Sequence, residues 1–229
     1  MSKTYRSAVA LIALCLVGAC GQATPGSGSA GASSELSPEA AEAALIEAMV
    51  NRASMGARAS GLTFTELFPQ VGESRALADA FRADVVAVEA GRAFGGSLDF
   101  DDDPFGEVPF DDPEADWRSF HVRVQVVEVF SGDVTVGQEL TIGLAFGSGL
   151  EMEVVSEGLV SMGDIVVFTR PGDFVVPYDP SITPVVWDGA FLSPVEGDRV
   201  PFPAVSLEGG AAPAVSRFDT LSELRKIAS

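Results

Sequence analysis

The residues with the most evident chemistry form an acidic stretch from Asp99 to Asp116, in which nine carboxylates occur without a basic residue. Closely spaced carboxylates can supply the roughly six to eight oxygen ligands that Ca²⁺ takes. Pro104 and Phe110 replace the glycine and the final glutamate of an EF-hand loop, so the stretch is not an EF-hand. We expect either an irregular calcium site or a solvated loop whose phenylalanines pack on the domain. The candidate calcium ligands are Asp99, Asp101, Asp103 and Asp111.

His121 is the only histidine and the obvious candidate for acid–base chemistry. Sequence alternation places it on the outward face of a strand, and Gly147-Ser148-Gly149 lacks the strand-to-helix setting of a nucleophilic serine. A zinc site usually takes several nitrogen or sulfur ligands, which this chain does not offer. We therefore expect His121 to be a surface residue and predict no catalytic residues.

Two further kinds of site remain open. A hydrolase with paired carboxylates needs two acids a few ångströms apart in different environments, and so acidic a chain always offers such pairs. Aromatic side chains could also line a small-ligand or peptide groove, although such residues more often pack in a core. The aromatic candidates are Trp117, Tyr178, Trp187 and Phe191.

The N-terminus has the pattern of a secretory signal. Lys3 and Arg6 precede an apolar run, Ala8 to Val17, that is too short to span a bilayer as a helix. The segment Val17-Gly18-Ala19-Cys20 resembles the bacterial lipobox. This resemblance implies cleavage after Ala19, a diacylglycerol thioether and palmitate on Cys20, and a place in the bacterial cell envelope outside the cytoplasm. Ordinary signal-peptidase cleavage is the alternative, since small residues also precede that cut.

The composition limits the partners. Without Lys3 and Arg6, the 14 basic residues become 12 against 33 acidic ones, a net charge of −21. Such a protein repels nucleic acid and anionic lipid, so we expect membrane attachment through lipid on Cys20 alone and no nucleic-acid partner. The expected partner is basic, cationic or neutral, and it is an envelope protein, a peptide or a glycan. Residues 20–36, rich in Gly, Ser and Ala, are expected to form a disordered tether.

Hydrophobic periodicity predicts helices at both ends of the remaining chain. Ser37 caps a first helix that begins at Pro38, a second short helix spans Glu73 to Arg82, and Thr220 with Glu223 caps a C-terminal helix. Between them we expect strands, the clearest at Ser119 to Phe130 with a β-bulge at Val126-Val127. The other expected strands are Asp84–Phe94, Leu140–Leu144, Met152–Val155, Ile165–Thr169, Phe174–Val176, Val185–Trp187 and Ala190–Leu192.

The strand and turn pattern of residues 84–205, which includes Ser131-Gly-Asp133 and Met162-Gly-Asp164, resembles that of uncharacterised secreted bacterial proteins with OB-like barrels. The resemblance implies a fold and carries no catalytic set. We expect a mainly β protein, with a small antiparallel barrel (OB-like) or sandwich flanked by helices. The expected segments are a signal peptide (1–19), a tether (20–36), a helical segment (37–83), a barrel (84–215) and a C-terminal helix (216–229). The expected function is non-enzymatic binding or support by a membrane-tethered module, without a cofactor unless Ca²⁺ binds.

Overall fold

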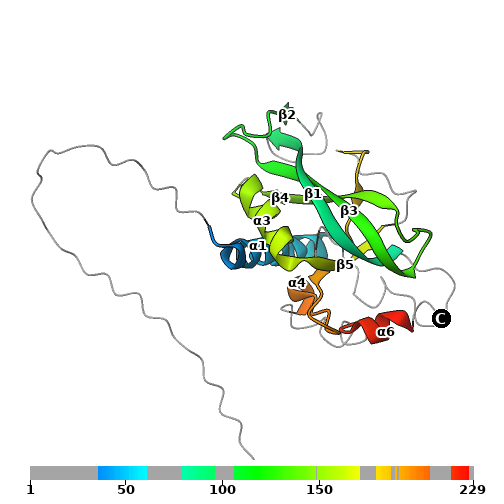
Figure 1. Cartoon of the computed structure of the whole chain (residues 1–229). Coiled ribbons are helices and arrows are strands. Elements are labelled where there is room, and N and C mark those ends of the chain that lie inside the picture. Colours follow the sequence, from blue (N-terminus) through cyan, green and yellow to red (C-terminus); the bar gives the residue numbers. More distant parts are fainter. Residues whose placement is uncertain are drawn as a thin grey trace, which may run out of the picture. The chain divides into compact units, whose positions relative to one another are not determined.

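The structure is a computed structural model, and it describes residues 36–60, 79–95, 106–147, 149–170, 179–186, 189, 191–206 and 218–226 (Figure 1). The fold is mainly β. The helices are α1 (Pro38–Ser60), α3 (Met152–Met162), α4 (Pro203–Ser206) and α6 (Leu221–Arg225). The strands are β1 (Asp79–Gly95), β2 (Gly106–Val108), β3 (Trp117–Ser131), β4 (Glu139–Gly147), β5 (Asp164–Thr169), β6 (Thr183–Pro184) and β7 (Leu192–Pro194).

One mixed, seven-stranded sheet carries the fold. Its order is β6-β4-β3-β1-β5-β7, and β2 pairs with the far end of β1. All pairs are antiparallel except β4 with β6. The long β1 pairs with β3 along most of its length and with β5 through residues 79–84 only. Because β1 is shared in this way, the sheet bends around one hydrophobic core.

The strand that the sequence predicts most clearly is confirmed. Alternate residues Val122, Val124 and Val126 of β3 are buried, as expected for a strand with one face on the core. The predicted β-bulge is also present, because Arg82 pairs with Glu128 while the next residue of β1 pairs with Val126, which leaves Val127 unpaired. The bulge lets β3 bend.

The expected small antiparallel barrel or sandwich is confirmed only as a mainly β fold, since the strand order of the described sheet has two ends, at β6 and β7, and one parallel pair. The two sides nevertheless approach each other. Thr169 of β5 forms an isolated bridge with Val185, and the Val186 amide donates to the Phe168 carbonyl at 2.9 Å. Pro184 ends β6 after two residues because proline has no N–H to continue a ladder.

Two predicted elements are wrong. Met152–Val155 begins helix α3 rather than a strand, because Val155, Leu159 and Met162 form a buried stripe with helical spacing. The sheet begins at Asp79, so the part of the predicted Glu73–Arg82 helix that is described lies in β1. Of the other expected strands, Phe174–Val176 lies outside the described residues, and β6 and β7 are displaced from the expected Val185–Trp187 and Ala190–Leu192.

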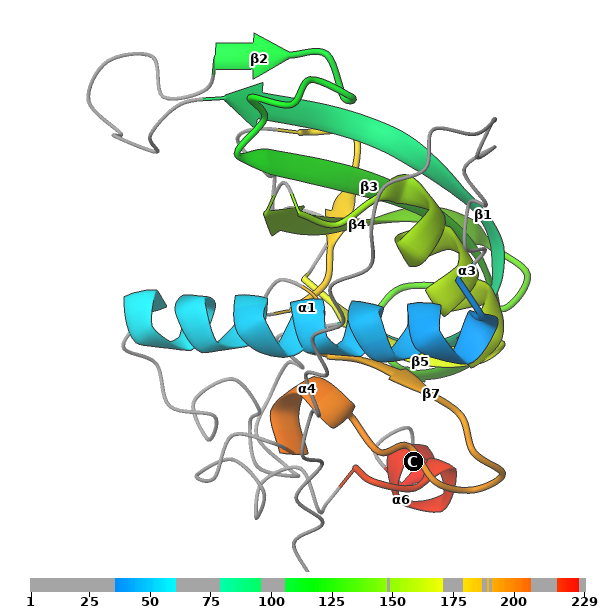
Figure 2. The same cartoon turned by 90° about the vertical axis from the view of Figure 1, so that its left-hand side faces the viewer.

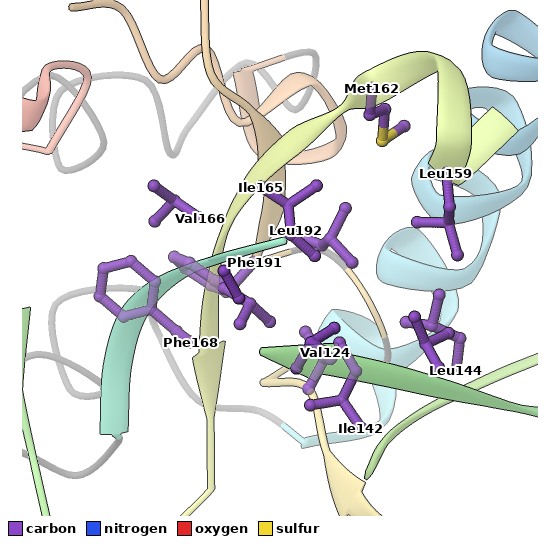
Figure 3. Packing of buried hydrophobic residues seen from close by; sticks show 14 of the residues in the cluster. Val124, Ile142, Leu144, Leu159, Met162, Ile165, Val166, Phe168, Phe191 and Leu192 are labelled. Atoms are coloured by element: carbon purple, nitrogen blue, oxygen red, sulfur yellow. The ribbon is translucent and has the colours of Figure 1, made fainter. Parts of the chain in front are cut away.

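The helices close the core on one side of the sheet. Ser37 begins α1 as predicted, since its hydroxyl accepts from the Ala40 amide at 3.3 Å. The two long helices approach closely at Gly158, where a Cβ atom would lie 2.9 Å from the Ala41 carbonyl oxygen. Apolar residues from β3, β4, β5 and α3 gather in one cluster (Figure 3), which includes Val124, Ile142, Leu144, Leu159 and Ile165.

The C-terminal region packs on β5. Thr220 caps α6 as predicted, with its hydroxyl accepting from the Glu223 amide at 3.1 Å. Phe168 of β5 contacts three other aromatic rings at centroid distances of 5.6–6.1 Å, and these belong to Phe191, Phe202 and Phe218. Within the described segments, no helix combines the length and the apolarity that a membrane crossing requires.

Candidate functional site

A groove of about 510 Å³ lies where α1 passes the beginning of β3 and the end of β4. Figure 2 shows α1 crossing beneath these two strands. The groove is open to solvent and lies within the size range of small-ligand sites, roughly 300–1,000 Å³. It is lined by Ala44, Glu47, Ala48, Asn51, Arg52, Asp116, Trp117, Phe146, Gly147, Gly149 and Leu150.

The most specific contact in the groove joins a cation to an aromatic ring. The guanidinium carbon of Arg52 lies 4.2 Å from the ring centroid of Trp117, within the range of a cation–π interaction. Trp117 is the first residue of β3 and pairs with Gly147 of β4. Gly147 and Gly149 line the groove beside the indole, and neither carries a side chain.

The groove combines an apolar floor with a charged rim. Ala44, Ala48, Phe146 and Leu150 are apolar, and the ring of Phe146 is almost completely buried. Glu47, Asn51 and Asp116 are exposed residues, and Arg52 is half-buried. Two carboxylates and one guanidinium therefore line the same site, and this arrangement can bind a group with a flat face, an apolar stem and a charge.

A second cluster surrounds His121 on the outer face of β3. The imidazole Nε2 lies 2.6 Å from an oxygen of Asp179, whose side chain is only 3% exposed. The other oxygen of Asp179 accepts hydrogen bonds from the hydroxyl and the amide of Ser181, at 2.5 and 3.2 Å. Burial raises the pKa of Asp179, but the hydrogen bonds from Ser181 and His121 outweigh it and hold this pKa below its ordinary value.

The surroundings show that the His121 cluster fixes a loop to the sheet. A Cβ atom on Gly91 would lie 2.7 Å from the imidazole, so the ring packs directly on the backbone of β1. The hydroxyl of Ser119 forms two hydrogen bonds with the backbone of Arg92. It donates to the Arg92 carbonyl at 3.0 Å and accepts from the Arg92 amide at 2.7 Å. Ile182 fills the space above Gly143. In the described part of the chain, the hydrogen bond given for His121 is to Asp179, and no hydroxyl is hydrogen-bonded to its imidazole.

The expectation for His121 is therefore met only in part. It faces outward as the alternation predicts, yet its side chain is 24% exposed and paired with a buried carboxylate. The sequence offered no signal for this pairing, because Asp179 is 58 residues away in a proline-containing segment.

The acidic stretch is ordered at its C-terminal end by Arg118. This buried guanidinium donates to the carbonyls of Phe110 and Asp112 at 2.8 and 3.2 Å. The carboxylate of Asp112 accepts from the Glu114 amide at 2.8 Å and so serves a local turn. Phe110 packs edge-on against Phe120 with centroids 5.4 Å apart, which confirms for this residue that a phenylalanine of the loop packs on the core.

The calcium prediction stays a prediction. Asp99, Asp101 and Asp103 lie outside the described residues, and Asp111 is exposed. Among the residues that the structure describes, no three His, Cys, Asp or Glu side chains gather to hold a metal ion.

One pair of carboxylates lies on neighbouring strands, where Asp84 of β1 faces Asp164 of β5. A hydrogen bond that protonated Asp84 donates to Asp164, with burial and charge repulsion, raises the pKa of Asp84. Hydrogen bonds from Arg82 and then Asp84 lower the pKa of Asp164, and Arg82 also forms an ion pair with it. Asp84 is exposed, so the pair lacks the enclosed setting that separates the roles of two catalytic acids.

Sequence reasoning found one side of the groove and missed the other. Trp117 lines the groove, whereas Phe191 is a core residue and Tyr178 and Trp187 lie outside the described residues. Arg52 and Glu47 were missed, because they flank the buried stripe of α1 and have the composition of an ordinary solvated helix face.

Cys20 and Ala19 also lie outside the described residues, and the chain divides into two units, Met1–Glu35 and Leu36–Ser229, of which the second contains every site described above. No model of a known protein family, no curated protein and no solved structure matches the chain, so its function has to be inferred from the geometry of its own residues.

Proposed function

We propose that the protein is a lipid-anchored binding module of the bacterial cell envelope, non-enzymatic, whose ligand occupies the groove between α1 and the β3–β4 end of the sheet. The observation that carries the proposal is the groove itself, in which an aromatic face, an apolar floor and charged side chains converge. Ligand sites are typically concave and mainly apolar, with a few polar groups that orient the ligand.

The proposed fold is OB-like, with the sheet strongly bent but left partly open rather than closed into a barrel. The support is the chain order, since the meander β1-β3-β4 is followed by α3, and β5 then returns to pair with β1. Residues 183–186 lie between β4 and β5, parallel to β4 through β6 and bridged to Thr169 of β5. Five-stranded, partly open barrels of this kind serve as platforms for ligands.

The proposed anchor is a lipid on Cys20. Its support is the lipobox-like segment Val17-Gly18-Ala19-Cys20 and the net charge of −19 for the full chain, which gives anionic membranes no electrostatic attraction for the rest of the protein. Diacylglycerol brings two chains to one residue, which suffices for stable anchoring.

The anchor is tested by labelling cells with radioactive palmitate and separating membranes from soluble protein. We expect label in the wild type and none in Cys20→Ser, which should leave the membrane fraction. Cys15→Ser is the matched control, since Cys15 lies inside the apolar run and should not change labelling. Label in Cys20→Ser, or its retention on membranes, contradicts the anchor.

The groove is tested by isothermal titration calorimetry of the mature Cys20→Ser protein with four probes: argininamide, citrullinamide, glutamate and N-acetylglucosamine. We expect at least one probe to bind and Ala48→Phe to abolish binding, because the new ring fills the floor of the groove. Val86→Phe is the matched control, since it adds the same ring at a site on β1 that is 48% exposed and outside the groove. If no probe binds, or if Ala48→Phe leaves all binding unchanged, the groove is not the binding site.

A further inference from the structure

We propose that the groove selectively binds the guanidinium group of an arginine side chain in a partner peptide. In the unliganded protein, the guanidinium of Arg52 occupies the position that this group would take. The inference rests on the proposed function, since it names the ligand of the same groove. The arrangement of Arg52 over Trp117 is the observation from which it starts.

Arg52 shows which group fits the indole. A guanidinium is planar and weakly hydrated, so it stacks on an aromatic face more readily than an ammonium does, and tryptophan is the best such face. The 4.2 Å separation of Arg52 and Trp117 places the cation where an incoming guanidinium would lie. Arg52 belongs to α1 and Trp117 to β3, so a rotamer change of the arginine exposes the indole without moving either element.

The charges of the groove favour a cation. Glu47 and Asp116 both line it, and a carboxylate binds a guanidinium through short charge-assisted hydrogen bonds. The whole chain adds a net charge of −19, which attracts cationic ligands over longer distances and repels anions. An anionic ligand would gain only Arg52 and would meet both carboxylates.

The floor of the groove suits the aliphatic stem of an arginine. Ala44 and Ala48 leave space between α1 and the sheet, and Leu150 and Phe146 complete an apolar surface. An arginine places its methylene groups on such surfaces while its charged end remains near water. The open form of the groove allows the rest of a peptide to remain outside.

Displacement of Arg52 has a measurable consequence. When a residue of the protein competes with the ligand, the apparent affinity equals the intrinsic affinity multiplied by the fraction of time for which the binding position is free. Removal of the Arg52 charge should therefore increase the affinity for a guanidinium. If Arg52 instead bound an anionic ligand directly, the same substitution would weaken the binding of that ligand.

The experiment is calorimetric titration of the mature Cys20→Ser protein with argininamide and with its neutral analogue citrullinamide. We expect argininamide to bind, and citrullinamide to bind at least about fivefold more weakly. Arg52→Met, which keeps an apolar stem over the indole, should tighten argininamide binding by about three- to tenfold. Trp117→Leu should abolish it, and the tripeptide Ala-Arg-Ala should bind at least as well as argininamide.

Arg123→Met is the matched control for charge. Arg123 lies on the outer face of β3 beside Glu89 and Glu139 and does not line the groove, so this variant changes the net charge equally and should change affinity less than about twofold. Melting temperatures of all variants establish that they fold. Since Trp117→Leu alters a packed residue, Glu47→Gln serves as a second variant and should weaken binding by about two- to threefold.

The outcomes separate the two proposals. If citrullinamide or glutamate binds as tightly as argininamide and Ala48→Phe blocks that binding, the groove is a binding site. The proposal that it selects a guanidinium is then wrong. Weaker argininamide binding in Arg52→Met also overturns the inference. If argininamide alone binds and Ala-Arg-Ala does not, the peptide partner is wrong. If no probe binds, the proposed function itself fails.

Discussion

The groove and the His121 cluster share strand β3, yet they use polar residues in opposite ways. Asp179 in the cluster is almost completely buried, and both of its oxygens are occupied by His121 and Ser181. Trp117 lies four residues before His121 on β3 and borders the groove. The acidic groups of this groove, Glu47 and Asp116, are exposed to solvent. Polar groups enclosed in the protein stabilise a fold by pairing with one another, whereas exposed polar groups that border an open groove can also contact a ligand.

The largest expected effect is loss of the buried carboxylate. Asp179→Ala leaves Ser181 and His121 without their acceptor, so we expect the free energy of unfolding to fall by about 2–4 kcal/mol. Glu47→Gln in the groove should change it by about 0.5 kcal/mol or less, as is usual for exposed residues. Urea denaturation of the Cys20→Ser protein measures both. Equal losses for the two variants would remove the distinction between the regions.

Paired glycine substitutions test the same contrast at the backbone. Gly143→Ala places a Cβ atom 2.0 Å from the Cδ1 atom of Ile182 and 2.9 Å from its Cβ atom, so residues 179–186 must shift, at a cost of about 1–3 kcal/mol. Gly149→Ala at the groove meets no atom within 4 Å and should be nearly neutral. Thermal unfolding of both variants checks this, and a neutral Gly143→Ala would show that the loop is not packed on β4.

The pH dependence of the cluster follows from the lowered pKa of Asp179. Its folded pKa lies below the ordinary value of 3.8, so the ionised form stabilises the fold fully above that value. This contribution is lost as the pH falls through the folded pKa. The stability difference between wild type and Asp179→Asn should therefore be smaller at about pH 3 than at about pH 5. Urea titrations at these pH values measure the difference, and a gap that widens in acid would contradict this assignment.

The sequence predicted those features that depend on neighbours in the chain. The alternation of β3, the bulge at Val127 and the caps at Ser37 and Thr220 are local and are confirmed. The helix α3 was mistaken for a strand because the predicted strand covered only Met152–Val155, too few residues to separate the two periods.

The candidate sites depend on contacts between distant residues and could not be predicted in the same way. Trp117 was identified as a possible groove residue from its type, but its partner Arg52 is 65 positions earlier on a helix of ordinary composition. The pairing of His121 with Asp179 likewise joins residues 58 positions apart in the chain. Tertiary structure, rather than local pattern, brings both pairs together.

The most direct test of the account is an NMR titration of the ¹⁵N-labelled Cys20→Ser protein with argininamide, because one spectrum reports on both regions. We predict that the indole N–H signal of Trp117 and the amide signals of Glu47 and Asn51 shift with ligand concentration, while the amide signals of His121 and Ser181 stay in place. Shifts centred on His121 and Ser181, with the groove signals unchanged, would contradict the assignment of the binding site to the groove.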